Sequence, residues 1–351
     1  MIAFGIALIG LGGLVSASYY TPVYRIRDWA WITSWSLLLF FAWIIFPIAA
    51  AQGVSGGNFF AIMKASSRFC IEMTLLFGIL RGFGGLMNGL SYRYLGISLA
   101  SSICIGVCAV FGTLIPPLID HKFLEYFSVP SGWVVLIGLF LCLVGTFCCG
   151  YAGMLKERFL TSKGEVTDSN ASGSKGEFAF TKGILIAVGG GVMSSCMAIA
   201  IKYGQPIDEA SVTAGVPAVF KSVPALVLSM GGGYLTNLVY CYIVASRNHS
   251  FSDWKKTRVL PANTFWAALS GLMVYGQYFL YVMGATKLGK LEFAAWTIFM
   301  SAIILFGALW GLLLREWKET GRKTLTWLWT GIAVLIISIC VIGIGPRFFP
   351  G

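Results

Sequence analysis

The sequence predicts an all-α polytopic membrane protein with about ten transmembrane helices, arranged as two inverted five-helix repeats. Of its 351 residues, 57% are hydrophobic and only 11% are charged, whereas a soluble protein of this length carries about 25% charged residues. Apolar runs of about 20 residues, enough for a membrane-crossing helix, recur along the whole chain. The alternating segments of about 10 residues that form transmembrane β-barrels are not seen.

The helices follow in order from the apolar runs. The first ends at Pro22, and the second follows the aromatic stretch RDWAWITSW, which is typical of a membrane interface. The seventh run is too long for one straight span, so we expect Pro217 and Pro224 to kink it or to confine its start to a re-entrant outer segment. The predicted helices are residues 2–22, 31–52, 70–90, 95–116, 131–153, 182–202, 214–245, 262–284, 291–314 and 325–346.

Basic residues indicate topology rather than nucleic-acid binding. The net charge is +11, but the lysines and arginines lie in short gaps between the apolar runs, mostly after the first, third, fifth, seventh and ninth helices. Because positive loops stay in the cytoplasm, both termini are expected to face outward from a bacterial cytoplasmic membrane. No basic residue precedes Arg25, so the start lacks the pattern of a signal peptide and is predicted to remain as the first helix.

One hydrophilic segment, 155–181, divides the chain. Its Gly, Ser, Asp and Lys content predicts a flexible cytoplasmic linker between a first repeat, 1–154, and a second, 182–351. Five helices is an odd number, so the second repeat must insert upside down. The halves show faint likeness: GGLVSAS (12–18) resembles GGGVMSS (189–195), and YLGISLASS (94–102) resembles KLGKLEFAAW (287–296). Inverted repeats are a transporter architecture with a midplane substrate site.

The eighth predicted helix carries the strongest indication of a substrate site. Gln277 and Tyr281 are four residues apart and share a face, with Tyr278 beside them and Tyr275 one turn earlier. Neutral hydrogen-bonding groups with aromatic faces suit a sugar-sized polyol.

Glu292 and Trp296 open the ninth helix, one turn apart. A coupling proton needs a carboxylate whose pKa rises on dehydration and falls when a water path opens, and Glu292 is the best candidate. The alternative is an interfacial acid, since Lys290 marks the membrane boundary. Sodium is the alternative coupling ion.

The third and first helices supply the remaining candidates. Arg81 lies well inside an apolar run, where a charge must face protein or water, and Asn88 follows on the same face. These could bind substrate, or Arg81 could be paired structurally. Tyr19 and Tyr20 could line the site or belong to an interfacial aromatic belt.

Enzyme chemistry is not indicated. The sequence has no phosphate-binding GxxxxGK[ST] and no convincing catalytic group. Its nine cysteines lie mostly within apolar runs, without metal-ligand spacing, so neither a cofactor nor a metal is expected.

The chain resembles the L-rhamnose–proton symporters of the drug/metabolite transporter superfamily over nearly its whole length. The motifs that carry the resemblance are FG…G (77–82), GL-x-x-RYLGxS (89–98), GT…P (112–117), MGGG…N (230–237), GLM-x-Y-x-Q-x-F-x-Y (271–281), REW…GR (315–322) and VIGIG (341–345). The resemblance implies a ten-helix symporter for a neutral deoxy-sugar and a proton. It places Tyr275, Gln277 and Tyr281 at polar positions of the eighth helix and Glu292 where the family has an acid.

Two departures fall on proposed site faces. The family's third helix typically has WGxGN where this chain has RGFGG (81–85), and the aromatic start of the ninth helix is reduced to LEFAA (291–295). Proton-coupled uptake of L-rhamnose is the leading hypothesis. The alternatives are an exporter or exchanger of drugs, nucleotide-sugars or other metabolites, with Arg81 binding an anion, and a non-transporting membrane sensor or scaffold.

Overall fold

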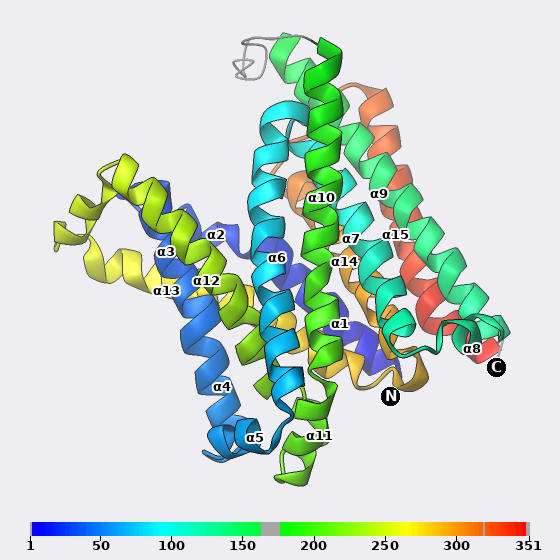
Figure 1. Cartoon of the computed structure of the whole chain (residues 1–351). Helices are drawn as coiled ribbons and strands as arrows, with labels where there is room; N and C mark the ends of the chain where they lie inside the picture. The colour runs from blue at the N-terminus through cyan, green and yellow to red at the C-terminus, as the bar shows by residue number, and fades with distance from the viewer. Residues whose placement is uncertain (1, 163–175, 319, 349–351) are drawn as a thin grey trace. The chain divides into compact units, whose positions relative to one another are not determined.

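The computed structural model describes residues 2–162, 176–318 and 320–348, and the secondary structure that it assigns there is helical (Figure 1). In chain order the helical segments are α1 Ile2–Ser18, α2 Tyr20–Val23, α3 Trp31–Phe40, η1 Phe41–Ile45, α4 Phe46–Val54, α5 Phe59–Ala65, α6 Arg68–Leu95, α7 Ile97–Ile119, α8 Phe123–Phe127, α9 Pro130–Ser162, α10 Gly176–Tyr203, α11 Gln205–Thr213, η2 Ala218–Phe220, α12 Val223–Arg247, η3 Ser250–Lys255, α13 Leu260–Ala285, η4 Gly289–Ala294, α14 Ala295–Leu313 and α15 Arg322–Phe348.

The polytopic fold class is confirmed. Within the described ranges, nine helical segments are long and apolar enough to cross a membrane. The 26-residue α13 is of similar length, but Asn263, Ser270, Gln277 and its tyrosines dilute its apolar character. The spans therefore agree with about ten predicted helices.

The structure corrects several predicted boundaries. α9 and α10 extend into the predicted linker, whose centre, 163–175, lies outside the described residues. Pro224 does not kink the seventh helix, because α12 starts at Val223 and Pro224 occupies its first turn, where no backbone N–H is needed. The ninth helix begins later than predicted, since Gly289–Ala294 forms a 3₁₀ turn before α14.

The chain folds into two compact units. Unit 1 comprises residues 3–83 and 196–289, and unit 2 comprises 84–195 and 290–351. Each unit contains residues from both halves of the sequence, so the two units do not coincide with the two predicted repeats. The division into repeats at 155–181 stays a prediction.

Glycines let α6 and α12 cross closely in unit 1. A Cβ at Gly78 would clash with the Ser229 carbonyl group, and one at Gly232 would clash with the Leu75 carbonyl oxygen and lie 2.8 Å from the Ile79 amide nitrogen. Small residues permit such backbone approach in membranes, where helices associate through van der Waals contact. The GGG motif therefore sets the spacing of these two helices.

Unit 2 uses the same device between α7 and α14. The Trp296 ring lies where a side chain at Gly112 would be, and its indole Nε1 donates to the Cys108 carbonyl at 3.1 Å. Thr113 and Thr297 share a buried hydrogen bond of 2.7 Å between their hydroxyls. These contacts account for the GT of the GT…P motif.

The RYLGxS motif forms the start of α7. Gly96 adopts a left-handed conformation with φ of 79°, and a Cβ there would lie 2.7 Å from Glu157 Oε2. The amide and hydroxyl of Ser98 both donate to Glu157 Oε1, at 3.0 and 2.8 Å. A carboxylate from α9 thus caps the N-terminus of α7, as the partial positive charge of that end favours.

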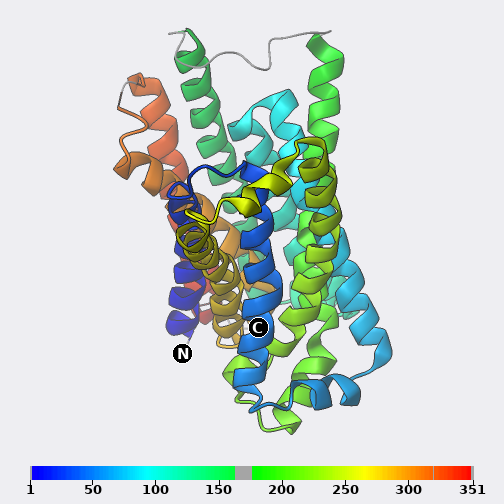
Figure 2. The same cartoon turned by 90° about the vertical axis from the view of Figure 1, so that its left-hand side faces the viewer.

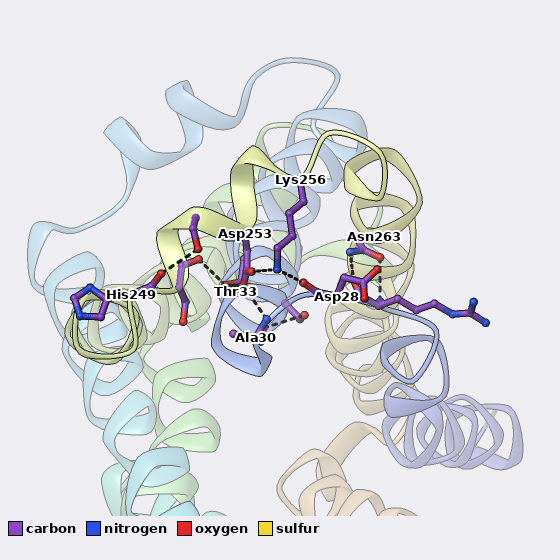
Figure 3. A network of polar contacts seen from close by, with 11 residues as sticks. Asp28, Ala30, Thr33, His249, Asp253, Lys256 and Asn263 are labelled. Carbon is purple, nitrogen blue, oxygen red and sulfur yellow. Dashed lines mark hydrogen bonds and ion pairs between the residues drawn. The ribbon is translucent and has the colours of Figure 1, made fainter.

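A polar cluster, which we call the latch, joins the segment before α3 to η3 in unit 1 (Figures 2 and 3). Asp253 Oδ2 accepts hydrogen bonds from the Ala30 amide at 2.8 Å and the Thr33 hydroxyl at 2.9 Å. Lys256 Nζ lies 2.7 Å from Asp253 Oδ1 and also donates to the Asp28 carbonyl. Asp253 is buried, so these contacts replace its lost water.

Asn263, at the start of α13, extends this connection. Its amide group donates to the Arg27 carbonyl at 2.8 Å and accepts from the Arg27 amide at 3.2 Å. The left-handed backbone at Asp28, with φ of 59°, turns the chain between these two attachments. The loop that joins α2 to α3 is therefore fixed at both ends by residues more than two hundred positions away.

Two adjacent glycines provide a matched test of the α6–α12 crossing. Gly232→Ala should lower the free energy of unfolding by on the order of 2 kcal/mol, because the added methyl group overpacks the crossing. Gly231→Ala should be neutral or stabilising, because nothing lies within 4 Å of its Cβ position. The measurement is thermal unfolding of both variants in detergent, and equal midpoints would contradict the close crossing.

The latch makes stability depend on pH. Burial would raise the pKa of Asp253, but hydrogen bonds from Lys256, Ala30 and Thr33 and the charge of Lys256 lower it below 3.8. The contribution of the Asp253 carboxylate to the free energy of unfolding is therefore fully present above its unfolded-state pKa of about 3.9. It is lost as the pH falls through the lower pKa of the folded state. Asp253→Asn should lower the melting midpoint by several degrees at pH 7, with the difference from wild type shrinking below about pH 4. A difference that is constant down to pH 3 would exclude an ionised latch.

Candidate functional site

Arg81 is the centre of a cationic and aromatic cluster in unit 1. Its Nη2 donates to the Tyr278 hydroxyl at 2.9 Å, and its Cζ lies 4.7 Å from the Trp43 ring centroid and 5.2 Å from that of Tyr278. No carboxylate among the described residues pairs with Arg81. Aromatic faces and one hydroxyl thus take the place of an ion pair, which is a favourable setting for a guanidinium away from water.

Trp43 reaches this cluster from a π-helical turn. α3 changes to the π-helix η1 at Phe41, and α4 resumes at Phe46, immediately before Pro47. A π-turn shifts the side chains that follow it around the helix and often occurs at functional sites. Gly233 keeps the space open, because a Cβ there would lie 3.3 Å from the Trp43 ring and 3.5 Å from Arg81 Nη1. Sequence reasoning missed Trp43, because an apolar run gives no sign of a π-turn.

Among the described residues, the buried polar atoms without a hydrogen-bond partner include one beside Arg81, on Trp43, and two on α13, on Ser270 and Tyr275. The Trp43 indole nitrogen and the Tyr275 hydroxyl make no hydrogen bond within the described structure. Tyr275 and Tyr278 are three residues apart on α13 and lie on neighbouring parts of one face. Buried polar groups are nearly always satisfied, so groups that are not are candidates for contact with a ligand.

Gln277 and Tyr281 are buried, as a site on α13 requires, and do not face lipid. The Gln277 amide donates to the Val274 carbonyl of its own helix at 3.0 Å. The structure brings Arg81 together with Tyr278, which the sequence could not show. The substrate-binding roles of Gln277 and Tyr281 stay predictions.

Tyr19 and Tyr20 belong to an aromatic stack. α1 ends at Ser18, and the rings of Tyr19 and Tyr20 lie 4.4 Å apart. Tyr20 stacks on Trp35 at 6.3 Å, and Trp35 stacks on the exposed Trp31 at 5.3 Å. Such a stack of partly exposed rings is typical of an interfacial belt, and both the belt and the site-lining role of Tyr19 and Tyr20 stay predictions.

The other predicted residues lie in unit 2, in three separate settings. Asn88 donates to the Tyr92 hydroxyl at 3.0 Å, while its side-chain oxygen has no partner among the described residues. Trp296 is 2% exposed and is held by Gly112 and Cys108 as described above. Glu292 lies half-buried in η4, and the structure leaves open both its coupling and its interfacial interpretation.

A second membrane-proximal acid, Asp208, was missed by sequence reasoning. Asp208 is 3% exposed in the short helix α11, and Ser222 donates a hydrogen bond of 2.6 Å to its Oδ2. Its neighbour Glu209, on the same helix, is exposed. The signal available was Ile207, Asp208 and Ser211 on one face of α11, following Pro206 in its first turn.

Comparison with known proteins gives one consistent result. The family described as L-rhamnose-proton symport protein (RhaT) matches residues 1–347. Relatives named L-rhamnose-proton symporter from Cronobacter sakazakii, Pectobacterium atrosepticum and Salmonella gallinarum are 34%, 32% and 33% identical. Each alignment spans 349 residues and covers 98% of this chain and 98% of the relative.

Two tyrosines on α13 allow a comparison between a hydroxyl that stabilises the fold and a hydroxyl that is available to a ligand. Tyr278→Phe removes the hydrogen bond to Arg81 and should lower the free energy of unfolding by on the order of 1 kcal/mol. Tyr275→Phe removes a hydroxyl that is buried without a partner, so it should be neutral or stabilising. Thermal unfolding of the two variants without ligand is the measurement, and destabilisation by Tyr275→Phe would show that its hydroxyl is already bonded.

Proposed function

The chain belongs to the L-rhamnose–proton symport protein family, and we propose that it takes up L-rhamnose together with a proton. It is a multi-pass protein of the inner membrane and a secondary transporter rather than an enzyme. The deoxy-sugar is neutral, so uptake against a gradient must draw its energy from the ion that accompanies it.

The observation that carries the sugar site is the pair of buried polar atoms at Tyr275 and Trp43, which make no hydrogen bond within the described residues, together with Arg81, which has no acidic partner there. A sugar hydroxyl both donates and accepts, so it can satisfy the tyrosine hydroxyl, the indole N–H and the free guanidinium donors together. The aromatic faces of Trp43 and Tyr278 suit the apolar C–H face and methyl group of a deoxy-sugar. We propose this cluster, with Gln277 and Tyr281, as the part of the sugar site in unit 1.

Glu292 is the proposed proton carrier. It is half-buried in the 3₁₀ turn before α14, and the family resemblance places it where related symporters have an acid. Asp208 is the competing acid, because it is more deeply buried. Its hydrogen bond with Ser222 favours a structural role in fixing α11 to the start of α12.

We further propose that both termini face outward and that the latch lies on the cytoplasmic side. The basic loops support this orientation. The inverted repeats gain support from one matched feature. The likeness of YLG (94–96) to KLG (287–289) places Gly96 and Gly289 at equivalent positions, and both have a positive φ, of 79° and 59°.

The rival function is exchange of an anionic metabolite. It is favoured by Arg81, which has no acidic partner among the described residues and stands where the family typically has tryptophan. The two functions predict different consequences for Arg81→Gln. A neutral sugar that loses one hydrogen bond loses about tenfold in affinity, whereas an anion that loses its only countercharge loses at least about a hundredfold.

Uptake itself is the test of the proposal. Cells without endogenous L-rhamnose uptake are given the chain, and L-rhamnose is added to a weakly buffered suspension. The medium should become alkaline as labelled sugar accumulates. Accumulation without a pH change would indicate that sodium rather than a proton is the coupling ion. In that case a sodium-free medium should abolish accumulation. Failure to accumulate any sugar would remove the symport proposal.

The coupling acid is identified by comparing accumulation with exchange. Glu292→Gln should abolish accumulation yet keep exchange of internal for external sugar in proteoliposomes, because exchange needs no net proton release. Asp208→Asn is the matched variant and should lower stability while keeping the accumulation ratio. If only Asp208→Asn lost coupling, Asp208 rather than Glu292 would be the proton carrier.

A further inference from the structure

A groove of about 360 Å³ lies between α3 and α12 in unit 1, with η3 at one end. Thr33, Ser36 and Phe40 share the α3 face of the groove, at three- and four-residue spacing. From Thr33 to Phe40 the groove follows α3 for about 10 Å at 1.5 Å per residue. Both helices are long and apolar enough to span a membrane, so the groove runs along the membrane-spanning part of the chain.

The walls are apolar along most of this length. Tyr234, Leu238 and Tyr242 line the α12 side, and Leu238 and Tyr242 are 45% and 65% exposed. The Phe40 and Tyr234 rings lie 6.2 Å apart and close the deep end. Such a surface takes a hydrocarbon chain, because it offers little hydrogen bonding to a sugar.

The opposite end of the groove is polar and meets the latch. Thr33 and Ser250 line it, and the Thr33 hydroxyl bonds to Asp253. Phe251 and Trp254 of η3 are partly exposed here, as aromatic residues at the head-group level of a bilayer are. The groove thus has the polarity gradient of a lipid, apolar within the span and polar at its end.

Charge decides which lipid fits. Arg247, Lys255 and Arg258 are exposed in the segment that surrounds η3. The acids at this end are Asp253, which is neutralised by Lys256, and the exposed Asp28. Clusters of basic residues next to a membrane span attract anionic head groups.

We propose that this groove binds an anionic phospholipid, with one acyl chain between α3 and α12 and the phosphate at Arg247, Lys255 and Arg258. The site is separate from the sugar cluster and does not depend on which solute is transported. Its occupant is a lipid of the surrounding membrane, because the groove opens along membrane-spanning helices and its charged end lies at their termini.

The test uses full-length protein in detergent micelles doped with phosphatidylglycerol or with phosphatidylcholine of the same acyl chains. Phosphatidylglycerol should raise the melting midpoint clearly more than phosphatidylcholine does. Leu238→Trp fills the groove and should remove at least half of that difference. Leu235→Trp is the matched control, because Leu235 is similarly exposed at 49% on the same helix but does not line the groove.

A second set of variants does not depend on the folding of Leu238→Trp. The combined Arg247→Gln, Lys255→Gln and Arg258→Gln changes should reduce the preference for phosphatidylglycerol while keeping the effect of phosphatidylcholine. Equal loss in Leu238→Trp and Leu235→Trp, or equal stabilisation by the two lipids, would overturn the proposal. Stabilisation by glycerol 3-phosphate alone would also overturn it, since the apolar groove would then contribute nothing.

Discussion

The position of the half-buried Arg81 within a membrane-spanning helix is the constraint on which the arrangement of unit 1 depends. A charge at this depth is costly unless other groups replace its water. Here the replacement is two aromatic faces and one tyrosine hydroxyl, drawn from η1 and α13. These groups can reach the guanidinium only if α6, α12 and the π-turn approach closely. The glycines at 78, 232 and 233 permit that approach by removing side chains where the backbones and rings meet.

The close packing around Arg81 explains how buried polar atoms without hydrogen-bond partners are tolerated in the described part of unit 1. The hydrogen bond from Arg81 to Tyr278 and the ring contacts fix the cluster before any solute arrives, while Tyr275 and Trp43 keep polar atoms without partners. The helix crossings offset the cost of those atoms. A solute that supplies the missing hydrogen bonds would find a preorganised set of groups, and preorganisation reduces the ordering that binding requires.

Composition and periodicity predicted the fold class, most spans and the burial of the α13 face, because apolar length and helical spacing are local properties. The family resemblance was likewise visible in the order of short motifs. Contacts between distant segments were not predictable in this way. The Trp43–Arg81 stack depends on a π-turn that no apolar run reveals, and the latch joins loops about 220 residues apart. The predicted seventh helix, 214–245, starts too early, because the two prolines confine its start, which was the second of the two predicted alternatives, and Pro224 lies in the first turn of α12. Asp208 was overlooked because short amphipathic helices resemble loops in sequence.

The groove between α3 and α12 has the latch at one end, and the residues that follow its other end, Trp43 in η1 and Gly233 in α12, contact Arg81 of α6. Phe40 closes the groove and is followed directly by η1, which carries Trp43. Tyr234, whose ring contacts that of Phe40, follows Gly233, and the backbone of Gly233 faces both Trp43 and Arg81. The spacing of α3 and α12 at the groove is therefore continuous with the packing of the Trp43 ring on the guanidinium, because side chains in a packed interior contact one another without gaps. The latch opposes that separation from the loop end, since Thr33 is at once a wall of the groove and a donor to Asp253. The α3–α12 packing thus joins the latch to the Arg81 cluster through one continuous set of contacts.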